Sequence, residues 1–128
     1  MPAWTDYKAE AKSRGALAFE VYVAVSTPVA PPEKVKEALP DHLAYLKGLE
    51  AKGSLMLAGP MSDETGAEMQ GMGMLVLRAQ SLEEARALAE GDPMHKTGAR
   101  SFVLRRWLIN EGSISVSTGL SSQSVALL

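Results

Sequence analysis

The stretch that decides the fold is PDHLAYLKGLEAKGSLMLAGP, Pro40–Pro60. It predicts a helix that begins at Pro40, because the missing N–H of a proline costs nothing at the first helical position. The helix is expected to run to about Lys52 and to stop at Gly53. A short apolar strand, Ser54–Ala58, follows at once and ends at Gly59-Pro60.

His42 is the residue of this stretch whose presence needs an explanation. At about 100° per residue it shares one apolar stripe of the helix with Leu46 and Leu49, at the spacing i, i+4, i+7. One interpretation is a core histidine whose ring nitrogens are satisfied by backbone groups. The other is an acid/base group at the mouth of a pocket. The stripe taken alone favours the first.

Outward from this stretch, apolar periodicity predicts three more strands and one more helix. The expected strands are Leu17–Val25, Met72–Arg78 and Phe102–Ile109, and the second helix begins at Ser81, with Glu84 completing a capping box, and stops at Gly91. Proline-containing Ser26–Pro32 is expected as a connector, Met61–Gly71 as a loop and Met94–Arg100 as a short irregular helix.

The resulting order is strand, helix, strand, strand, helix, strand. That order predicts an α+β, ferredoxin-like fold, βαββαβ, whose antiparallel sheet carries both helices on one face. We expect this domain to cover residues 17–112, after an N-terminal extension of residues 1–16 and before a C-terminal strand and tail of residues 113–128.

The opposite face of the predicted sheet is also apolar. A monomer would expose that face as one large patch. Pairing with a second copy, sheet against sheet, would bury it, so we expect a homodimer or a higher homo-oligomer.

The composition limits the classes of function. The 128 residues are 46% hydrophobic and 22% charged, as in ordinary globular domains. A net charge of −2 with mixed signs offers no basic stripe for phosphates, so no nucleic acid partner is expected. The chain has no cysteine, which excludes disulfides and thiolate zinc sites. Without a run of about 18 apolar residues or a secretory signal pattern, we expect a soluble, cytoplasmic protein that does not enter a membrane.

Few residues carry recognisable chemistry. The two histidines, His42 and His95, lie far apart and in no metal-binding spacing, so no metal is expected. Gly71-Met-Gly73 lacks the remaining glycine and the helix of a dinucleotide loop, and no organic cofactor is expected. Adjacent Arg105 and Arg106 favour solvent or dimer contacts over anion binding. The methionines at 61, 69, 72 and 74 would line a ligand pocket or fill gaps in the core.

Asp92 has two interpretations. Before Pro93 it is a favoured helix N-cap, worth about 1 kcal/mol. In a ferredoxin-like subunit, however, the start of the first helix and the end of the second lie side by side, so Asp92 is placed to meet His42. A carboxylate beside an imidazole fixes its tautomer, as a general base requires.

The motifs resemble those of the YciI-like (YCII-related) family over about Leu17–Gly112. They are His42-Leu-Ala-Tyr-Leu46, Gly53-Ser-Leu55, Ala58-Gly-Pro60, Ser81-Leu-Glu-Glu-Ala85 and Asp92-Pro-Met94. The resemblance implies a dimeric α+β barrel with a His–Asp pair in its pocket, here His42 and Asp92. The family's best-defined activity is dehydrochlorination of a chlorinated hydroxyquinol, and its fold is similar to that of muconolactone isomerases. Many relatives carry an arginine shortly before the histidine, where this chain has Ala38-Leu-Pro40.

The sequence therefore predicts a small cofactor-free lyase or isomerase that binds a small molecule. His42 would be the general acid/base, Asp92 would orient it, and Gly59 and Pro60 would form the substrate-binding wall. The alternative is a non-catalytic ligand-binding or regulatory dimer in which His42 is polar lining. A cofactor-free oxygenase on the same barrel is a third option, against which the aromatic content of 5% counts.

Overall fold

In the computed structural model, residues 1–127 are described, and they divide into two compact units. One unit is Glu20–Trp107, which carries most of the secondary structure. The other combines Met1–Phe19 with the chain from Leu108 onward. The bounds of the predicted domain and of its two extensions remain a prediction.

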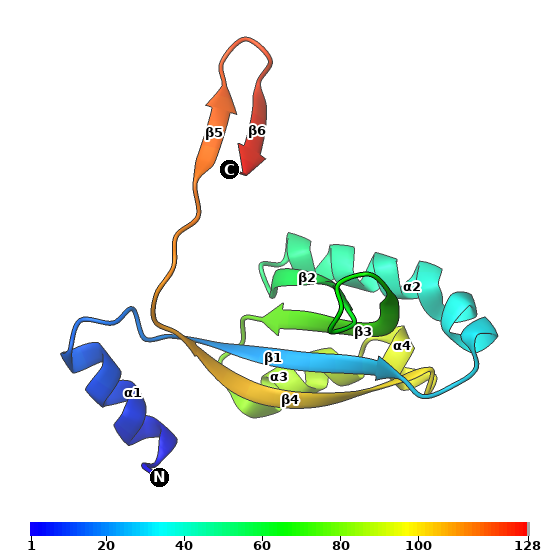
Figure 1. The fold of residues 1–128 in the computed structure, drawn as a ribbon, viewed down its shortest axis with the longest axis horizontal. Coiled ribbons are helices and arrows are strands. Elements are labelled where there is room, and N and C mark those ends of the chain that lie inside the picture. The colour runs from blue at the N-terminus through cyan, green and yellow to red at the C-terminus, as the bar shows by residue number, and fades with distance from the viewer. Residues whose placement is uncertain (128) are drawn as a thin grey trace. The chain divides into compact units, whose positions relative to one another are not determined.

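A four-stranded sheet forms the frame of the larger unit (Figure 1). Its strands are β1 (Phe19–Pro28), β2 (Leu55–Ser62), β3 (Met69–Leu77) and β4 (Arg100–Ile109), in the order β2-β3-β1-β4. The helices are α2 (Pro32–Ala51), α3 (Leu82–Glu90) and the four-residue α4 (Pro93–Lys96). Antiparallel pairing joins β3 to both β1 and β2. This order of elements and strands confirms the ferredoxin-like α+β fold.

Both long helices cover the same face of the sheet. Alternate residues of β1 and β3 point into one apolar cluster with buried positions of α2 and α3, as the period of two predicts. Its buried members are Tyr22, Ala24, Leu49, Leu75, Leu77, Ala85 and Ala89. The predicted stripe of the first helix is confirmed at Leu49, which is buried, and at Leu46, which packs against the cluster.

The opposite face of the sheet carries no helix of this unit. Val103 and Trp107 of β4 alternate with the core-packed residues Phe102 and Leu104 and are exposed. Leu57 of β2 pairs with Val76 of β3 and is also exposed. The apolar second face predicted from the sequence is therefore present.

Helix α2 begins earlier than predicted. It runs without a break from Pro32, so Pro40 lies in the helix interior and does not open it. Pro32 takes the first helical position instead. The burial of Ala38 and Leu49, one on each side of Pro40 in the sequence, stabilises the helix through the proline-containing turn. The predicted stop is confirmed: Gly53 has φ +80°, and Ser54 N–H donates to Leu49 O at 2.9 Å.

Two strands extend through prolines, contrary to the sequence prediction. β1 continues to Pro28, and Ser26 pairs with Gly73 of β3. β2 contains Gly59 and Pro60, which the sequence placed at its end. It is an edge strand with a register irregularity after Pro60, and a proline is tolerated in that setting. β3 likewise begins at Met69, inside the predicted loop.

The caps of α3 and α4 follow the predicted chemistry. Ser81 Oγ accepts from Glu84 N–H at 3.1 Å, whereas the Glu84 carboxylate reaches Gln80 N–H, one residue before the cap. Asp92 Oδ1 accepts from Met94 N–H at 2.9 Å and so begins α4. Helix α4 and the start of β4 replace the predicted irregular helix over Met94–Arg100.

The smaller unit has its own apolar cluster. Helix α1 (Trp4–Ser13) buries Ala11 against Ala18 and Leu108, with Trp4 and Tyr7 packed around them. A two-stranded hairpin follows, β5 (Val116–Gly119) and β6 (Ser124–Leu127). The predicted C-terminal strand thus corresponds to β5, and residue 128 of the tail lies outside the described residues. Over residues 1–127, no helix combines the length and apolar character that crossing a membrane requires.

Candidate acid/base site

A cavity of about 520 Å³ lies in the larger unit between α2, the sheet and α4. Its wall is mostly apolar, and a few polar groups converge on it. The polar and charged side chains that line it are Ser26, His42, Asp92, His95 and Arg100. Concave, apolar sites with few polar groups are typical of small-molecule binding.

His42 and Asp92 form a hydrogen-bonded pair in this cavity. His42 Nδ1 lies 2.8 Å from Asp92 Oδ2 and 2.9 Å from Oδ1. The ionised carboxylate only accepts, so Nδ1 carries the proton and donates it. The sequence argument that the two helices would bring these residues together is therefore correct in its geometry. The catalytic roles assigned to them remain predictions.

Asp92 is held from two sides. It is fully buried, and its Oδ1 accepts from Met94 N–H as well as from His42. The helix cap and the histidine partner are thus the same carboxylate, and both interpretations of Asp92 hold at once. Because a backbone amide fixes the carboxylate, the carboxylate in turn fixes the orientation of the His42 ring and the direction in which Nε2 points.

The second ring nitrogen of His42 is the one that is not bonded to Asp92. Nε2 has no hydrogen-bond partner among residues 1–127, while no buried side-chain nitrogen or oxygen of these residues is unpaired. Nε2 is therefore accessible, and the His42 side chain retains 19% exposure on the cavity wall. With Nδ1 protonated, Nε2 holds the lone pair that accepts a proton.

Tyr45, one turn after His42, closes the far side of Asp92. Its hydroxyl donates to Leu88 O at 2.7 Å. Burial raises the pKa of the Tyr45 phenol, and the Asp92 carboxylate adds to that rise. A Cβ on Gly91 would lie 2.5 Å from this hydroxyl, so the glycine before Asp92 leaves the space that Tyr45 fills.

A second polar network, which the sequence did not predict, lines the same cavity. His95 Nδ1 donates to Ala89 O at 2.7 Å, and its Nε2 lies 2.8 Å from Ser26 Oγ. Arg100 Nε donates to the same Ser26 Oγ at 2.9 Å. These three side chains come from α4, β1 and β4, the very segments whose bounds the sequence prediction placed wrongly.

A signal for two of these residues was nevertheless present. Ser26 continues the alternation of Tyr22 and Ala24 toward the helices, and Arg100 continues that of Phe102 and Leu104. Extending both strands by two residues would have placed them on the inner face. Of the arginines that the sequence singled out, Arg106 pairs with Glu20 at 3.8 Å and Arg105 is exposed.

The two predicted wall residues also reach the cavity. Gly59 and Pro60 line it from β2, together with three of the four methionines, Met69, Met72 and Met74. These methionines thus face a cavity, and Met61 does not line it. All four residues proposed from the sequence border one cavity.

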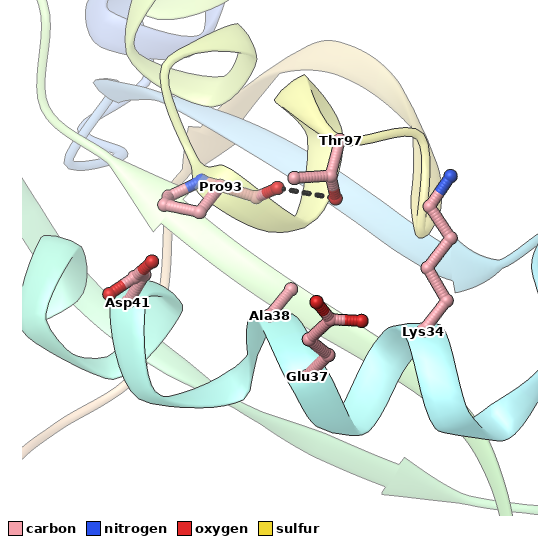
Figure 2. Close-up of a pocket in the computed structure, with 6 residues that line it drawn as sticks. All are labelled: Lys34, Glu37, Ala38, Asp41, Pro93 and Thr97. Carbon is pink, nitrogen blue, oxygen red and sulfur yellow. Dashed lines mark hydrogen bonds between the residues drawn. The ribbon is translucent and has the colours of Figure 1, made fainter.

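A smaller cavity of about 230 Å³ lies between α2 and α4 (Figure 2). It is lined by Lys34, Glu37, Ala38, Asp41, Pro93 and Thr97, none of which borders the larger cavity. Thr97 Oγ1 donates to Pro93 O at 2.8 Å across one wall. Neither histidine lines it. No cluster of three or more potential metal-ligating His, Asp or Glu side chains occurs within residues 1–127.

Comparison with known proteins gives a family, a relative and a structure. The family described as "YCII-related domain" matches residues 3–108. An uncharacterized protein of Bacillus subtilis (strain 168), YjpA, is 32% identical over 76 residues, which are 59% of this chain and 82% of that protein. A solved structure, 5-chloro-2-hydroxyhydroquinone dehydrochlorinase (TftG) from Burkholderia phenoliruptrix AC1100 in complex with 2,5-dihydroxybenzoquinone, matches with a TM-score of 0.49 and 23% identity, covering 67% of this chain and 92% of that one.

Proposed function

Because the chain belongs to the family of YCII-related domains, with a match over residues 3–108, we propose that it is a small acid/base enzyme, a lyase or isomerase. The observation that carries the proposal is the His42–Asp92 pair, which leaves Nε2 without a hydrogen bond on the wall of a mostly apolar cavity. No metal or organic cofactor takes part in the proposed reaction.

In the proposed reaction, His42 Nε2 takes a proton from a carbon next to a carbonyl group of the substrate. The C–H electron pair moves into the carbonyl and forms an enolate. In a lyase the enolate collapses and expels a leaving group such as chloride, and the proton passes from His42 to water. In an isomerase His42 returns the proton to another carbon. Positioned acid/base catalysis of this kind contributes about 10²–10⁴-fold.

Asp92 serves this reaction by orienting His42 and by balancing its charge. When Nε2 takes up the proton, the imidazolium lies 2.8 Å from the buried carboxylate. Gly59 and Pro60 form the wall opposite α2, where the substrate ring would lie. The resemblance of the motifs to the YciI-like family implies chlorinated hydroxyquinols and lactones as the substrate class to test first.

The rival function is a ligand-binding or regulatory dimer without turnover. The buried partner of His42 favours the enzyme, because polar lining alone does not need a histidine fixed by a carboxylate. The same proposal includes a homodimer, supported by the exposed apolar face of the sheet, to which Leu57, Val103 and Trp107 contribute.

Turnover separates the two functions. The full chain is incubated with a panel of hydroxyquinols, their chlorinated forms and small unsaturated lactones, and product is followed by absorbance and chloride release. We expect conversion by the wild type and a loss of at least about 100-fold in His42→Asn. Lys47→Gln, an exposed change on the same helix outside the cavity lining, is the matched control. Equal rates in wild type and His42→Asn would reject the enzyme, and binding without turnover would support the rival.

A further inference from the structure

Arg100 is the one arginine or lysine among the described residues that line the cavity. It begins β4 and points to the helix-covered face, as do Phe102 and Leu104 after it. Burial lowers the pKa of Arg100, and the nearby Asp92 carboxylate raises it. A guanidinium remains charged under all ordinary conditions, so the cavity holds a permanent positive charge.

The protein fixes this guanidinium without neutralising it. Arg100 Nε donates to Ser26 Oγ at 2.9 Å, and Nη2 donates to Ser26 O at 2.8 Å and to Gly71 O. All these acceptors are uncharged oxygens. Within residues 1–127 no carboxylate lies within ion-pair distance of Arg100, because the Asp92 carboxylate is directed at His42 and Met94 N–H.

Ser26 and His95 determine which way the guanidinium faces. His95 Nδ1 donates its proton to Ala89 O, so in the neutral tautomer Nε2 accepts the Ser26 hydroxyl proton. The Ser26 oxygen is then left with lone pairs for Arg100 Nε. Ser26 and His95 therefore act through Arg100, as positioning residues.

One end of the guanidinium is open. Nη1 has no hydrogen-bond partner among the described residues, and no buried side-chain nitrogen of these residues is unpaired, so Nη1 is accessible. Nη2 lies at the β3 glycines, bonded to Gly71 O and 4.0 Å from where a Cβ of Gly73 would stand. Both glycines line the main cavity. An outer pocket that Arg100 also borders contains the oppositely charged Glu90 and Lys96, so a variant at Lys96 distinguishes that pocket from the main cavity.

We propose that Arg100 binds an anionic oxygen of the substrate, and that the substrate is therefore a small organic acid whose reacting carbon lies at His42. This inference rests on the proposed function and adds the class of substrate. A guanidinium held by neutral acceptors contributes a charge-assisted hydrogen bond to a carboxylate oxygen, whereas an uncharged ligand gains much less.

Binding of benzoate and benzamide to the full chain tests the proposal by calorimetry. The two probes have the same ring and nearly the same shape and differ in charge. We expect benzoate to bind about tenfold more tightly than benzamide, and the ratio to fall to about one in Arg100→Met. Arg100→Lys keeps the charge but loses the planar fork, so it retains part of the preference. Arg78→Met, which removes an exposed arginine bonded to Gly53 O, is the matched control and leaves the ratio unchanged.

Further variants locate the site and separate the two proposals. We expect Ser26→Ala to reduce the benzoate preference and Lys96→Met, in the outer pocket, to leave it intact. Equal affinities of the two probes in the wild type, or a preference that survives Arg100→Met, would overturn the inference. His42→Asn is expected to keep the benzoate preference while losing turnover. A preference without turnover in the wild type would therefore refute the enzyme alone, and turnover without a preference would refute the anion site alone.

Discussion

At the scale of single residues, Asp92 has two roles: it caps a helix and it is the hydrogen-bond partner of a histidine. Its Oδ1 caps α4 through Met94 N–H, and both carboxylate oxygens hold the Nδ1 proton of His42. An asparagine in its place would preserve the first role, because Asn and Asp are equally good N-caps. It would weaken the second by removing the negative charge.

Asp92→Asn is therefore expected to separate stability from chemistry. Its free energy of unfolding in urea should change by no more than about 1 kcal/mol, whereas turnover should fall by about 10²-fold or more. Asp92→Ala should lower both, since it leaves Met94 N–H and His42 without a partner. Nitrogen-15 NMR of the imidazole ring checks the cause without any substrate: wild type should show a proton on Nδ1. Full activity of Asp92→Asn would contradict the role given to the carboxylate.

The pair itself was predictable from local patterns, whereas the network around Arg100 also required the positions of the strand ends. His42 lies on a helical stripe and Asp92 precedes a proline, so both positions follow from local patterns. Ser26, His95 and Arg100 meet only because two strands run two or more residues further than their prolines and glycines suggest. Tertiary pairing decided those strand ends, and a single sequence does not contain that information in local form.

At the scale of elements, tertiary packing also overrides a local sequence preference in α2. A proline in a helix interior removes one backbone hydrogen bond and costs about 3 kcal/mol. The helix nevertheless continues past Pro40 because residues on both sides of it, Ala38 and Leu49, are buried on the same face. The sequence identified the helix, its stop and its buried stripe, and placed only the start wrongly.

Pro40→Ala should consequently stabilise the protein by about 1–3 kcal/mol in urea unfolding, because an alanine restores the missing N–H and favours the helix. Pro32→Ala is the matched control: Pro32 lies in the first turn, where no helical hydrogen bond is lost, and its replacement should give no such gain. A destabilised Pro40→Ala would indicate that the protein needs the proline to shape the helix near His42.

Two tyrosines that lie between the helices and the sheet also make the free energy of unfolding depend on pH in the alkaline range. Burial raises the pKa of Tyr22 and of Tyr45 in the folded protein above the ordinary value of 10.0. Above that pH the unfolded chain releases phenolic protons that the folded chain keeps, so the unfolded state binds fewer protons and stability falls as pH rises.

Urea unfolding between pH 8 and pH 11 measures this loss. The wild type should hold its midpoint up to about pH 10 and lose stability above it, as the two phenols are forced to ionise. Tyr45→Phe should start from a lower stability, because Leu88 O loses its hydrogen bond, but should lose less of it above pH 10. An identical alkaline slope in the wild type and the variant would contradict the assignment.

At the scale of the whole molecule, the proposed homodimer rests on the face of the sheet that carries no helix of the larger unit. Val103 is 54% exposed and Trp107 42%, and both lie on the edge strand β4. If this face forms the proposed homodimer, a single charge there should prevent it. A buried unpaired charge in an interface costs several kcal/mol.

Val103→Glu should thus shift the protein to monomer in sedimentation equilibrium, whereas we expect the wild type to sediment as a dimer. Val29→Glu places the same charge on an equally exposed valine between β1 and α2 and should leave the dimer intact. A monomeric wild type, or a dimer that tolerates Val103→Glu but not Val29→Glu, would move the interface elsewhere or remove it.

The β5–β6 hairpin leaves main-chain hydrogen-bonding groups unpaired at its edges. In a sheet of two strands each strand is an edge, so half of the peptide groups of Val116–Gly119 and Ser124–Leu127 have no ladder partner within it. Its side chains include exposed Val116, Val125 and Leu127 and no charged residue. Such an edge accepts further strands whatever their sequence, so at high concentration this hairpin, and not the larger unit, is where chains would begin to aggregate. A lysine at Val125 would block that growth without touching the cavity.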